Sequence, residues 1–202
     1  MSPIHREVPD QLYKEFNRTE ASHRTSSHRG DDTVTINSKD LSIRLAISED
    51  VDAIVAIYNE AVRDTTSTFD TEPKTVEQQL EWLKAHDARH PVIVAVIEQQ
   101  VIGWGALSKW SDRPAYNQTG ETSSYVSQKF RGRGVGRALK RTLIKDAKRL
   151  GYHTLLARVA EGNEASMYLN ESLDFELIGT MKQVGLKFGK RLDVHLMQLM
   201  LE

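Results

Sequence analysis

Residues 125–137, with the sequence YVSQKFRGRGVGR, form the most informative stretch of the chain. The first residues predict the end of a strand, and the three glycines that follow predict a tight turn leading into a helix from Arg137 onward. In such a unit, unpaired backbone N–H groups and the positive end of the helix converge on one point. This geometry predicts a binding site for phosphate.

The helix that follows the glycines is strongly basic. Residues 128–150 contain nine Lys or Arg residues and one acid, Asp146. The nine are Lys129, Arg131, Arg133, Arg137, Lys140, Arg141, Lys145, Lys148 and Arg149. The whole chain is nearly neutral, with 27 Lys+Arg against 28 Asp+Glu, so its overall field does not attract nucleic acids or membranes. The local charge therefore predicts a polyanionic ligand at this one place.

Two common phosphate-binding patterns do not fit the glycines. A P-loop requires Gly-Lys-Ser/Thr, whereas Gly136 is followed by Arg137 and Ala138. The dinucleotide fingerprint, counted from Gly132 and Gly134, requires a third glycine where the chain has Arg137. The remaining pattern is Arg-x-x-Gly-x-Gly, and its alternative interpretation is a glycine-rich turn before a solvated basic helix.

Hydrophobic periodicity predicts one α+β domain over residues 41–202. Strands are expected over residues 43–46, 91–97, 101–107, 121–127, 153–159, 175–180 and 193–199. Helices are expected after Ser48 and Thr75, as their N-caps, and over residues 137–150 and 164–173. This order predicts a mixed, mostly antiparallel sheet flanked by helices. Residues 1–40 are polar and are expected to form a flexible N-terminal extension.

The composition excludes several classes of site. The 202 residues contain no cysteine, which excludes a disulfide framework, a thiolate nucleophile and sulfur-ligated zinc. The seven histidines show no metal-binding spacing, so no metal is expected. No apolar run reaches the roughly 18 residues of a membrane span, and the expected location is the cytoplasm.

The Arg-x-x-Gly-x-Gly pattern resembles the pyrophosphate loop of the GNAT family of N-acetyltransferases, which bind acetyl-coenzyme A. The resemblance covers residues 41–202 and is most specific to the phosphinothricin and methionine sulfoximine acetyltransferases. The matching stretches are residues 57–62, 71–73, 113–116, 121–126, 163–166, 183–189, 192–194 and 197–199. The resemblance implies the GNAT fold, a homodimer, and transfer of the acetyl group from acetyl-coenzyme A to a small amino acid or analogue. Methionine sulfoximine, methionine sulfone and phosphinothricin are the implied acceptors.

The resemblance also implies roles for individual residues. Glu121 corresponds to the general base, which is needed because an amine must lose a proton before it attacks a thioester. The coenzyme-binding residues implied are Ser124, Tyr125, Val126, Arg131, Gly132, Arg133, Gly134, Val135, Gly136, Arg137, Asn163 and Ser172. Asn163 is also expected to cap the helix that follows it. The acceptor pocket implied includes Arg113, Pro114, Ala115 and Tyr116, with Tyr58 and Phe69 as further candidates that are better explained as core residues.

The sequence departs from the family pattern at two places near this site. Asn170 stands where many relatives have a Tyr or His that protonates the departing thiolate, so Asn170 is predicted to act only by donating an amide hydrogen bond. Asp174 replaces a glycine and is expected to adopt a left-handed conformation.

Other functions remain open at this point. The two departures are compatible with a non-catalytic sensor that binds acetyl-coenzyme A. The acceptor can also be a protein N-terminus or an aminoglycoside, although the match at residues 187–189 favours small amino acids. RNA binding through residues 131–134 is disfavoured because Phe130 is the one aromatic residue available there for base stacking.

Overall fold

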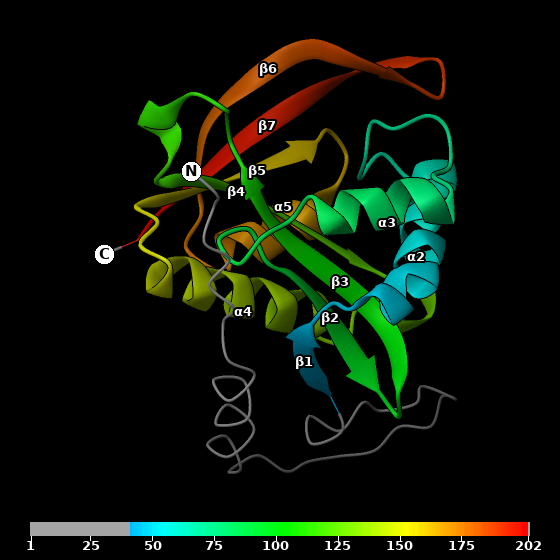
Figure 1. Ribbon diagram of the computed structural model, residues 1–202. Coiled ribbons are helices and arrows are strands. Elements are labelled where there is room, and N and C mark those ends of the chain that lie inside the picture. The colour runs from blue at the N-terminus through cyan, green and yellow to red at the C-terminus, as the bar shows by residue number, and fades with distance from the viewer. Residues whose placement is uncertain (1–40, 202) are drawn as a thin grey trace, which may run out of the picture.

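The computed structural model of the protein describes residues 41–201, which form one seven-stranded sheet with helices packed against it (Figure 1). The strand order is β1-β2-β3-β4-β5-β7-β6, and all neighbours are antiparallel except β4 and β5. The strands are β1 (Ser42–Leu45), β2 (Val92–Ile97), β3 (Gln100–Lys109), β4 (Thr119–Val126), β5 (Thr154–Ala160), β6 (Glu176–Lys187) and β7 (Lys190–Met200). The α-helices are α2 (Val51–Asp64), α3 (Val76–Lys84), α4 (Val135–Arg149) and α5 (Glu164–Glu171). The predicted α+β architecture is confirmed, and the prediction for residues 1–40 lies outside the described residues.

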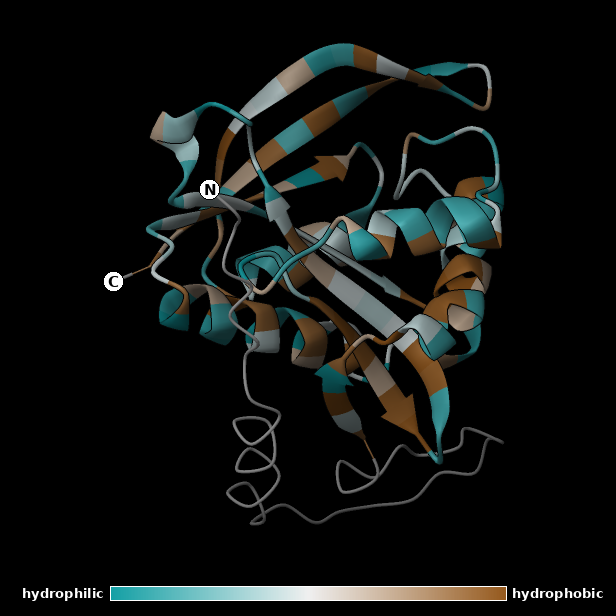
Figure 2. Cartoon of the chain, viewed as in Figure 1, coloured by the Kyte–Doolittle hydropathy of each residue, from teal (hydrophilic) through white to brown (hydrophobic). Residues whose placement is uncertain are grey.

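Both faces of the central sheet are covered. On one face Val94 of β2 packs with Ile54 of α2, and on the other face Ile93 packs with Leu139 and Leu143 of α4. Because both faces are buried, β2 is a continuous apolar run rather than an alternation, as the brown colour of this strand shows (Figure 2).

Two glycines of β3 let α4 approach the sheet closely. A Cβ atom at Gly105 would lie 3.1 Å from the side chain of Leu143, and one at Gly103 would lie 3.3 Å from the side chain of Leu139. Larger residues would push the helix outward. The close packing brings the first turns of α4 directly against the middle of the sheet.

The parallel pair β4 and β5 separates part-way along its length. The two strands are paired from Thr119 with Thr154 to Glu121 with Leu156, and no pairing follows. Beyond Glu121, β4 continues to Val126 with only β3 as its partner. The edge of β4 that faces β5 is therefore unpaired from Thr122 onward, which leaves its backbone groups available for another partner.

The helix starts differ in part from the sequence-based expectation. The capping box of Thr75 and Gln78 is confirmed by hydrogen bonds of 3.0 and 3.2 Å. Ser48 as an N-cap is wrong, because a short 3₁₀ turn (Ser48–Asp50) precedes α2. The buried carboxylate of Asp50 accepts the N–H of Ile47 at 2.9 Å. Among the described residues, no helix is long and apolar enough to cross a membrane.

The last two strands are much longer than predicted. The sequence predicts strands here only over residues 175–180 and 193–199, and it assigns residues 181–192 to no element. Instead β6 and β7 form a long hairpin whose turn is Phe188 and Gly189, both with positive φ angles of 51° and 72°. The hairpin curves over one end of the sheet (Figure 1). At Asp174, just before β6, the expected left-handed conformation is confirmed, with φ of 65°.

Candidate active site

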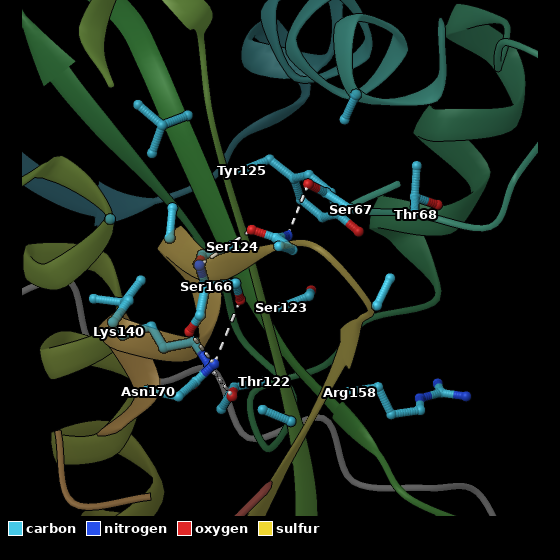
Figure 3. A pocket seen from close by; sticks show the side chains of 18 of the residues that line it. Ser67, Thr68, Thr122, Ser123, Ser124, Tyr125, Lys140, Arg158, Ser166 and Asn170 are labelled. Carbon is cyan, nitrogen blue, oxygen red and sulfur yellow. Dashed lines mark hydrogen bonds between the residues drawn. The ribbon is translucent and has the colours of Figure 1, made fainter. Parts of the chain in front are cut away.

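A cavity of about 1220 Å³ lies where β4 and β5 separate, and part of it is seen in Figure 3. It is bounded by the glycine turn, the unpaired edge of β4, the end of β5, α5 and the loop between α2 and α3. Glu121 and Asn170 line it, together with every expected coenzyme-binding residue except Arg133. The structure therefore brings together segments that are widely separated in the sequence.

The glycine turn forms one end of this cavity. Gly132 and Gly134 have φ angles of 72° and 82°, and a Cβ atom at either would meet nothing within 4 Å. Glycine is favoured there by the left-handed backbone rather than by crowding. Gly134 is the N-cap of α4 and provides no capping side chain, so the first backbone N–H groups of the helix are not capped by this residue. These groups can bind an anion. The helix begins at Val135, two residues earlier than predicted.

The arginines near the turn are held by defined contacts. The Nε of Arg131 donates to the carbonyl of Val126 at 3.0 Å. The guanidinium of Arg133 lies 5.8 Å from the ring centre of Phe130. The guanidinium of Arg137 donates to the carbonyl of Ser172 at 3.5 Å. The turn thus combines free backbone donors with fixed positive charge, as a diphosphate requires.

Asn163 links three elements at the far side of the cavity. Its Oδ1 accepts the N–H of Ser166 at 3.1 Å, which confirms the expected N-cap of α5. Its Nδ2 donates to the hydroxyl of Ser67, in the loop between α2 and α3, at 3.1 Å.

Glu121 is the last residue of β4 that pairs with β5, so it sits at the point where the cavity opens. Both carboxylate oxygens of Glu121 accept hydrogen bonds from Arg158 of β5, at 2.6 and 2.7 Å. The Glu121 side chain is 17% exposed and that of Arg158 is 54% exposed. This pairing raises the pKa of Arg158. Because a carboxylate has about four acceptor sites, Glu121 can still accept a hydrogen bond from a donor in the cavity.

Lys140 of α4 is an unexpected member of the site. The residue is only 3% exposed, and its Nζ donates to Thr122 Oγ1 at 3.1 Å and, through a short hydrogen bond, to Asn170 Oδ1. Figure 3 shows these three side chains together, with Arg158 pointing away from them. Burial lowers the pKa of Lys140 to about 7, and the charge of Glu121 partly opposes this shift.

The burial of Lys140 corrects the interpretation of the basic helix. The sequence groups Lys140 among nine basic residues that predict a polyanionic ligand, with a solvated basic helix as the alternative; at Lys140 the side chain is buried rather than solvated. A signal was present, because residues 136, 140, 143 and 147 fall on one helical face and the other three are Gly, Leu and Ala. A lysine within an apolar stripe either extends its ammonium to the surface or is buried together with polar partners.

Asn170 is 1% exposed and orients Lys140. Its Nδ2 donates to the carbonyl of Ser166 at 2.8 Å and approaches the Ser166 hydroxyl at 3.4 Å. These contacts fix the amide so that its oxygen faces Lys140. The amide nitrogen, which the sequence predicts to donate to the departing sulfur, donates to Ser166 instead.

The loop between α2 and α3 closes the cavity. The Tyr58 hydroxyl donates to Asp70 at 2.8 Å, and Lys187 of β6 donates to the carbonyl of Thr68 at 2.7 Å. A Cβ atom at Gly185 would lie 2.0 Å from the ring of Phe69, so this glycine allows the hairpin to press against the loop. Tyr58 and Phe69 both line the cavity. Tyr58 also packs against the core as expected, whereas Phe69 is 36% exposed, so its interpretation as a core residue is wrong. Burial raises the pKa of Tyr58, which therefore acts as a neutral donor.

The expected acceptor loop lies outside the large cavity. Arg113 precedes a 3₁₀ turn formed by Pro114, Ala115 and Tyr116, and none of the four lines the cavity. Tyr116 instead lines a smaller cavity of about 380 Å³ with Arg89 and His90. The loop still reaches the site, because the guanidinium of Arg158 lies 5.9 Å from the ring centre of Trp110.

Comparisons with known proteins identify this arrangement. The model of the acetyltransferase (GNAT) family matches residues 54–175. The chain belongs to this family. It is 37% identical over 163 residues to an L-methionine sulfoximine/L-methionine sulfone acetyltransferase of Pseudomonas paraeruginosa, covering 80% of this chain and 95% of the relative. It is 35% identical over 159 residues to a phosphinothricin N-acetyltransferase of Streptomyces coelicolor, covering 77% and 93%.

A solved structure shows the same GNAT fold with a ligand. The phosphinothricin acetyltransferase of Sinorhizobium meliloti in complex with acetyl-coenzyme A superposes with a TM-score of 0.76 at 33% identity, over 80% of this chain and 89% of that one. The chain is thus an N-acetyltransferase of the GNAT family, and the resemblance to the phosphinothricin and methionine sulfoximine branch is confirmed.

Proposed function

We propose that the protein transfers the acetyl group of acetyl-coenzyme A directly to the amine of a small amino acid or analogue. Methionine sulfoximine, methionine sulfone and phosphinothricin are the acceptors that the similar proteins favour. The observation that carries the proposal is the separation of β4 and β5. The cavity that opens there has the glycine turn, which can bind a diphosphate, at one end and the carboxylate of Glu121 at the other.

The coenzyme fits this opening in one direction. Its diphosphate binds the N–H groups after Gly134 and the guanidinium groups nearby. Its pantetheine arm, which carries two amides, pairs with the free edge of β4 at Ser124, Tyr125 and Val126. Asn163 and Ser172 bound the opposite side. The thioester then reaches the level of Glu121.

Glu121 is the proposed general base. It removes a proton from the acceptor ammonium, directly or through a water, so that the neutral amine attacks the thioester carbonyl. The backbone N–H groups on the free edge of β4 can stabilise the oxyanion that forms. Arg158 holds the carboxylate in place, and its exposed guanidinium can also attract an acceptor carboxylate or phosphinate.

The loop from Arg113 to Tyr116 remains the proposed acceptor-recognition segment. Trp110, a few residues earlier, contacts Arg158 and connects this loop with the base. Arg113 is the proposed partner of the acceptor anion, and Tyr116, which is 42% exposed, can cover the acceptor side chain.

A homodimer is also proposed. The edge strand β6 and its turn expose a set of apolar side chains that a monomer would leave in water. They are Leu177, Ile178, Val184, Leu186 and Phe188. Figure 2 shows apolar (brown) bands along the hairpin of β6 and β7.

An acceptor screen tests the proposed function. Purified protein is incubated with acetyl-coenzyme A and one acceptor at a time, and free thiol is measured. The panel includes methionine sulfoximine, methionine sulfone, phosphinothricin, peptides with free N-termini and an aminoglycoside. Thiol release with the three amino-acid analogues supports the proposal. Release only with peptides or the aminoglycoside contradicts the acceptor class, and coenzyme binding without release for any acceptor indicates a sensor.

A further inference from the structure

Lys140 is a buried lysine whose hydrogen-bond partners are neutral. Among residues 41–201, its hydrogen bonds go to a hydroxyl and an amide oxygen, and no carboxylate forms an ion pair with it. Its ammonium also lies 4.8 Å from the ring centre of Phe175. Burying a cation without a carboxylate partner destabilises a fold, and a methionine would fill the same space. The residue therefore calls for a role beyond packing.

The position of Lys140 relative to the cavity suggests that role. Lys140 is six residues after Gly134, which places it about 9 Å along the helix from the diphosphate-binding end. Its Nζ bonds to Thr122, the residue next to Glu121, and the side chain lines the same cavity. A coenzyme arm that extends from the glycine turn to Glu121 would run along β4 past Thr122, to which this ammonium is bonded.

The ammonium is also held in a fixed orientation. Thr122 of β4 and Asn170 of α5 accept two of its three hydrogens from different sides, and Ser166 in turn fixes Asn170. Fixed donors of this kind stabilise developing negative charge without reorganisation. One hydrogen of the ammonium is left for a group in the cavity.

We propose that Lys140 is a catalytic residue that stabilises and protonates the coenzyme A thiolate as it leaves. The inference rests on the proposed function. When the tetrahedral adduct collapses, its C–S bond breaks and the electron pair leaves with sulfur. The thiolate takes a proton from the Lys140 ammonium, giving coenzyme A thiol and a neutral lysine. The lysine regains a proton from solvent before the next turnover, and Glu121 returns the first proton of the acceptor ammonium to solvent. The adduct nitrogen loses its second proton to water as the amide forms, so each turnover releases one proton.

The electrostatic surroundings suit this proton transfer. With a pKa near 7, Lys140 can both give up and regain a proton at neutral pH. The negative charge of Glu121 of β4 acts on Lys140 and favours its protonated form. Thr122, Asn170 and Phe175, from β4, α5 and the segment before β6, are uncharged. Asn170 and Thr122 are thus positioning residues.

Turnover of Lys140→Met is the first test. We expect kcat to fall about 100-fold with little change in KM for acetyl-coenzyme A, because the diphosphate contacts remain. The matched control is Lys148→Met, an exposed lysine on the same helix that the cavity does not include. A double variant adds Asn170→His to Lys140→Met, which places an imidazole as a new proton donor beside the position of the lost ammonium. Recovery of at least tenfold in kcat supports proton donation, whereas a purely structural role predicts no recovery.

Binding of coenzyme A gives a readout independent of turnover. The thiol of the bound coenzyme is titrated by its ultraviolet thiolate absorbance, and affinity is compared with that of desulfo-coenzyme A, which lacks the sulfur. We expect wild-type protein to ionise the bound thiol at lower pH than Lys140→Met does. Lys140→Met should lose affinity for coenzyme A but not for the desulfo analogue.

The possible outcomes separate the two proposals. If the bound thiol titrates identically in both proteins and kcat is unchanged, the role of Lys140 is overturned while the proposed function stands. Acetylation of Nζ itself during turnover, detected by mass spectrometry, would also overturn it, since the lysine would then be a nucleophile. A wild-type protein that binds neither coenzyme contradicts both proposals.

Discussion

The guanidinium of Arg158 donates two hydrogen bonds, of 2.6 and 2.7 Å, to the carboxylate of Glu121. Glu121 is the last residue of β4 that pairs with β5. The pair joins the two strands at the point where they separate. It also orients the one carboxylate that lines the cavity at the proposed thioester position. The proposed role of Glu121 as a base therefore depends on Arg158 as well.

Glu121→Gln should lower kcat about 100-fold or more, because glutamine cannot remove a proton from the acceptor amine. Affinity for coenzyme A should change little, since Glu121 lies beyond the turn that is proposed to bind the diphosphate. Steady-state kinetics and calorimetric titration measure the two effects. Glu81→Gln, an exposed change on α3, is the control, and an unchanged kcat in Glu121→Gln would remove Glu121 from the role of base.

Gly134→Ala should weaken coenzyme binding more than it weakens the fold. The residue has φ of 82°, where alanine costs about 1 kcal/mol in unfolding free energy, and relaxing that strain would turn the N–H groups away from the diphosphate. Urea unfolding and coenzyme titration measure the two effects. Gly179→Ala is a matched control, because Gly179 also has open space but no positive φ. Equal affinity in both variants would argue against this turn as the diphosphate site.

The stability of the protein should depend on pH through Lys140. Its pKa is about 7 in the folded protein, against an ordinary value of 10.5, so the unfolded chain binds more protons between these values. Stability from this group therefore rises as pH increases from 7 to 10 and is lost as pH falls toward 7. Lys140→Met removes the buried charge.

Melting temperatures test this dependence. Lys140→Met should be more stable than wild type at pH 7, and the difference should shrink toward pH 10. The variant would then be more stable and less active, as expected when a residue is kept for function at a cost in stability. A difference that does not vary with pH would show that the buried amine is not responsible.

Leu186→Asp should prevent the proposed homodimer. Leu186 is 62% exposed on the edge strand β6, so the change costs a monomer little. Light scattering after size-exclusion chromatography measures the mass. Val76→Asp, an equivalent change at an exposed residue of α3, should leave the dimer intact. A wild-type monomer, or a dimer in both variants, would contradict this interface.

The local features of the site could be predicted from the sequence. The glycine turn, the N-cap at Asn163 and the left-handed Asp174 each depend on a few neighbouring residues, whose types limit the backbone. The family resemblance then supplied the position of Glu121 at the mouth of the cavity.

The features that were missed depend on packing and strand register. Arg158 meets Glu121 only because β4 and β5 are parallel neighbours in a register that the sequence does not specify. Lys140 is buried because glycines on β3 bring α4 close to the sheet. The long hairpin of β6 and β7 was missed because its far end packs on the loop at Phe69 rather than on the main core. Local residue patterns carry little information about such distant contacts.

The most direct test of acetyl transfer is the stoichiometry of a single reaction. Protein, acetyl-coenzyme A and methionine sulfoximine are mixed, and the free thiol and the N-acetyl product are quantified together by absorbance and mass spectrometry. We predict one N-acetyl product for each thiol released, and almost no release without the acceptor. Thiol release that does not depend on the acceptor, or that yields acetate instead of the N-acetyl product, would contradict direct transfer to an amine beside Glu121.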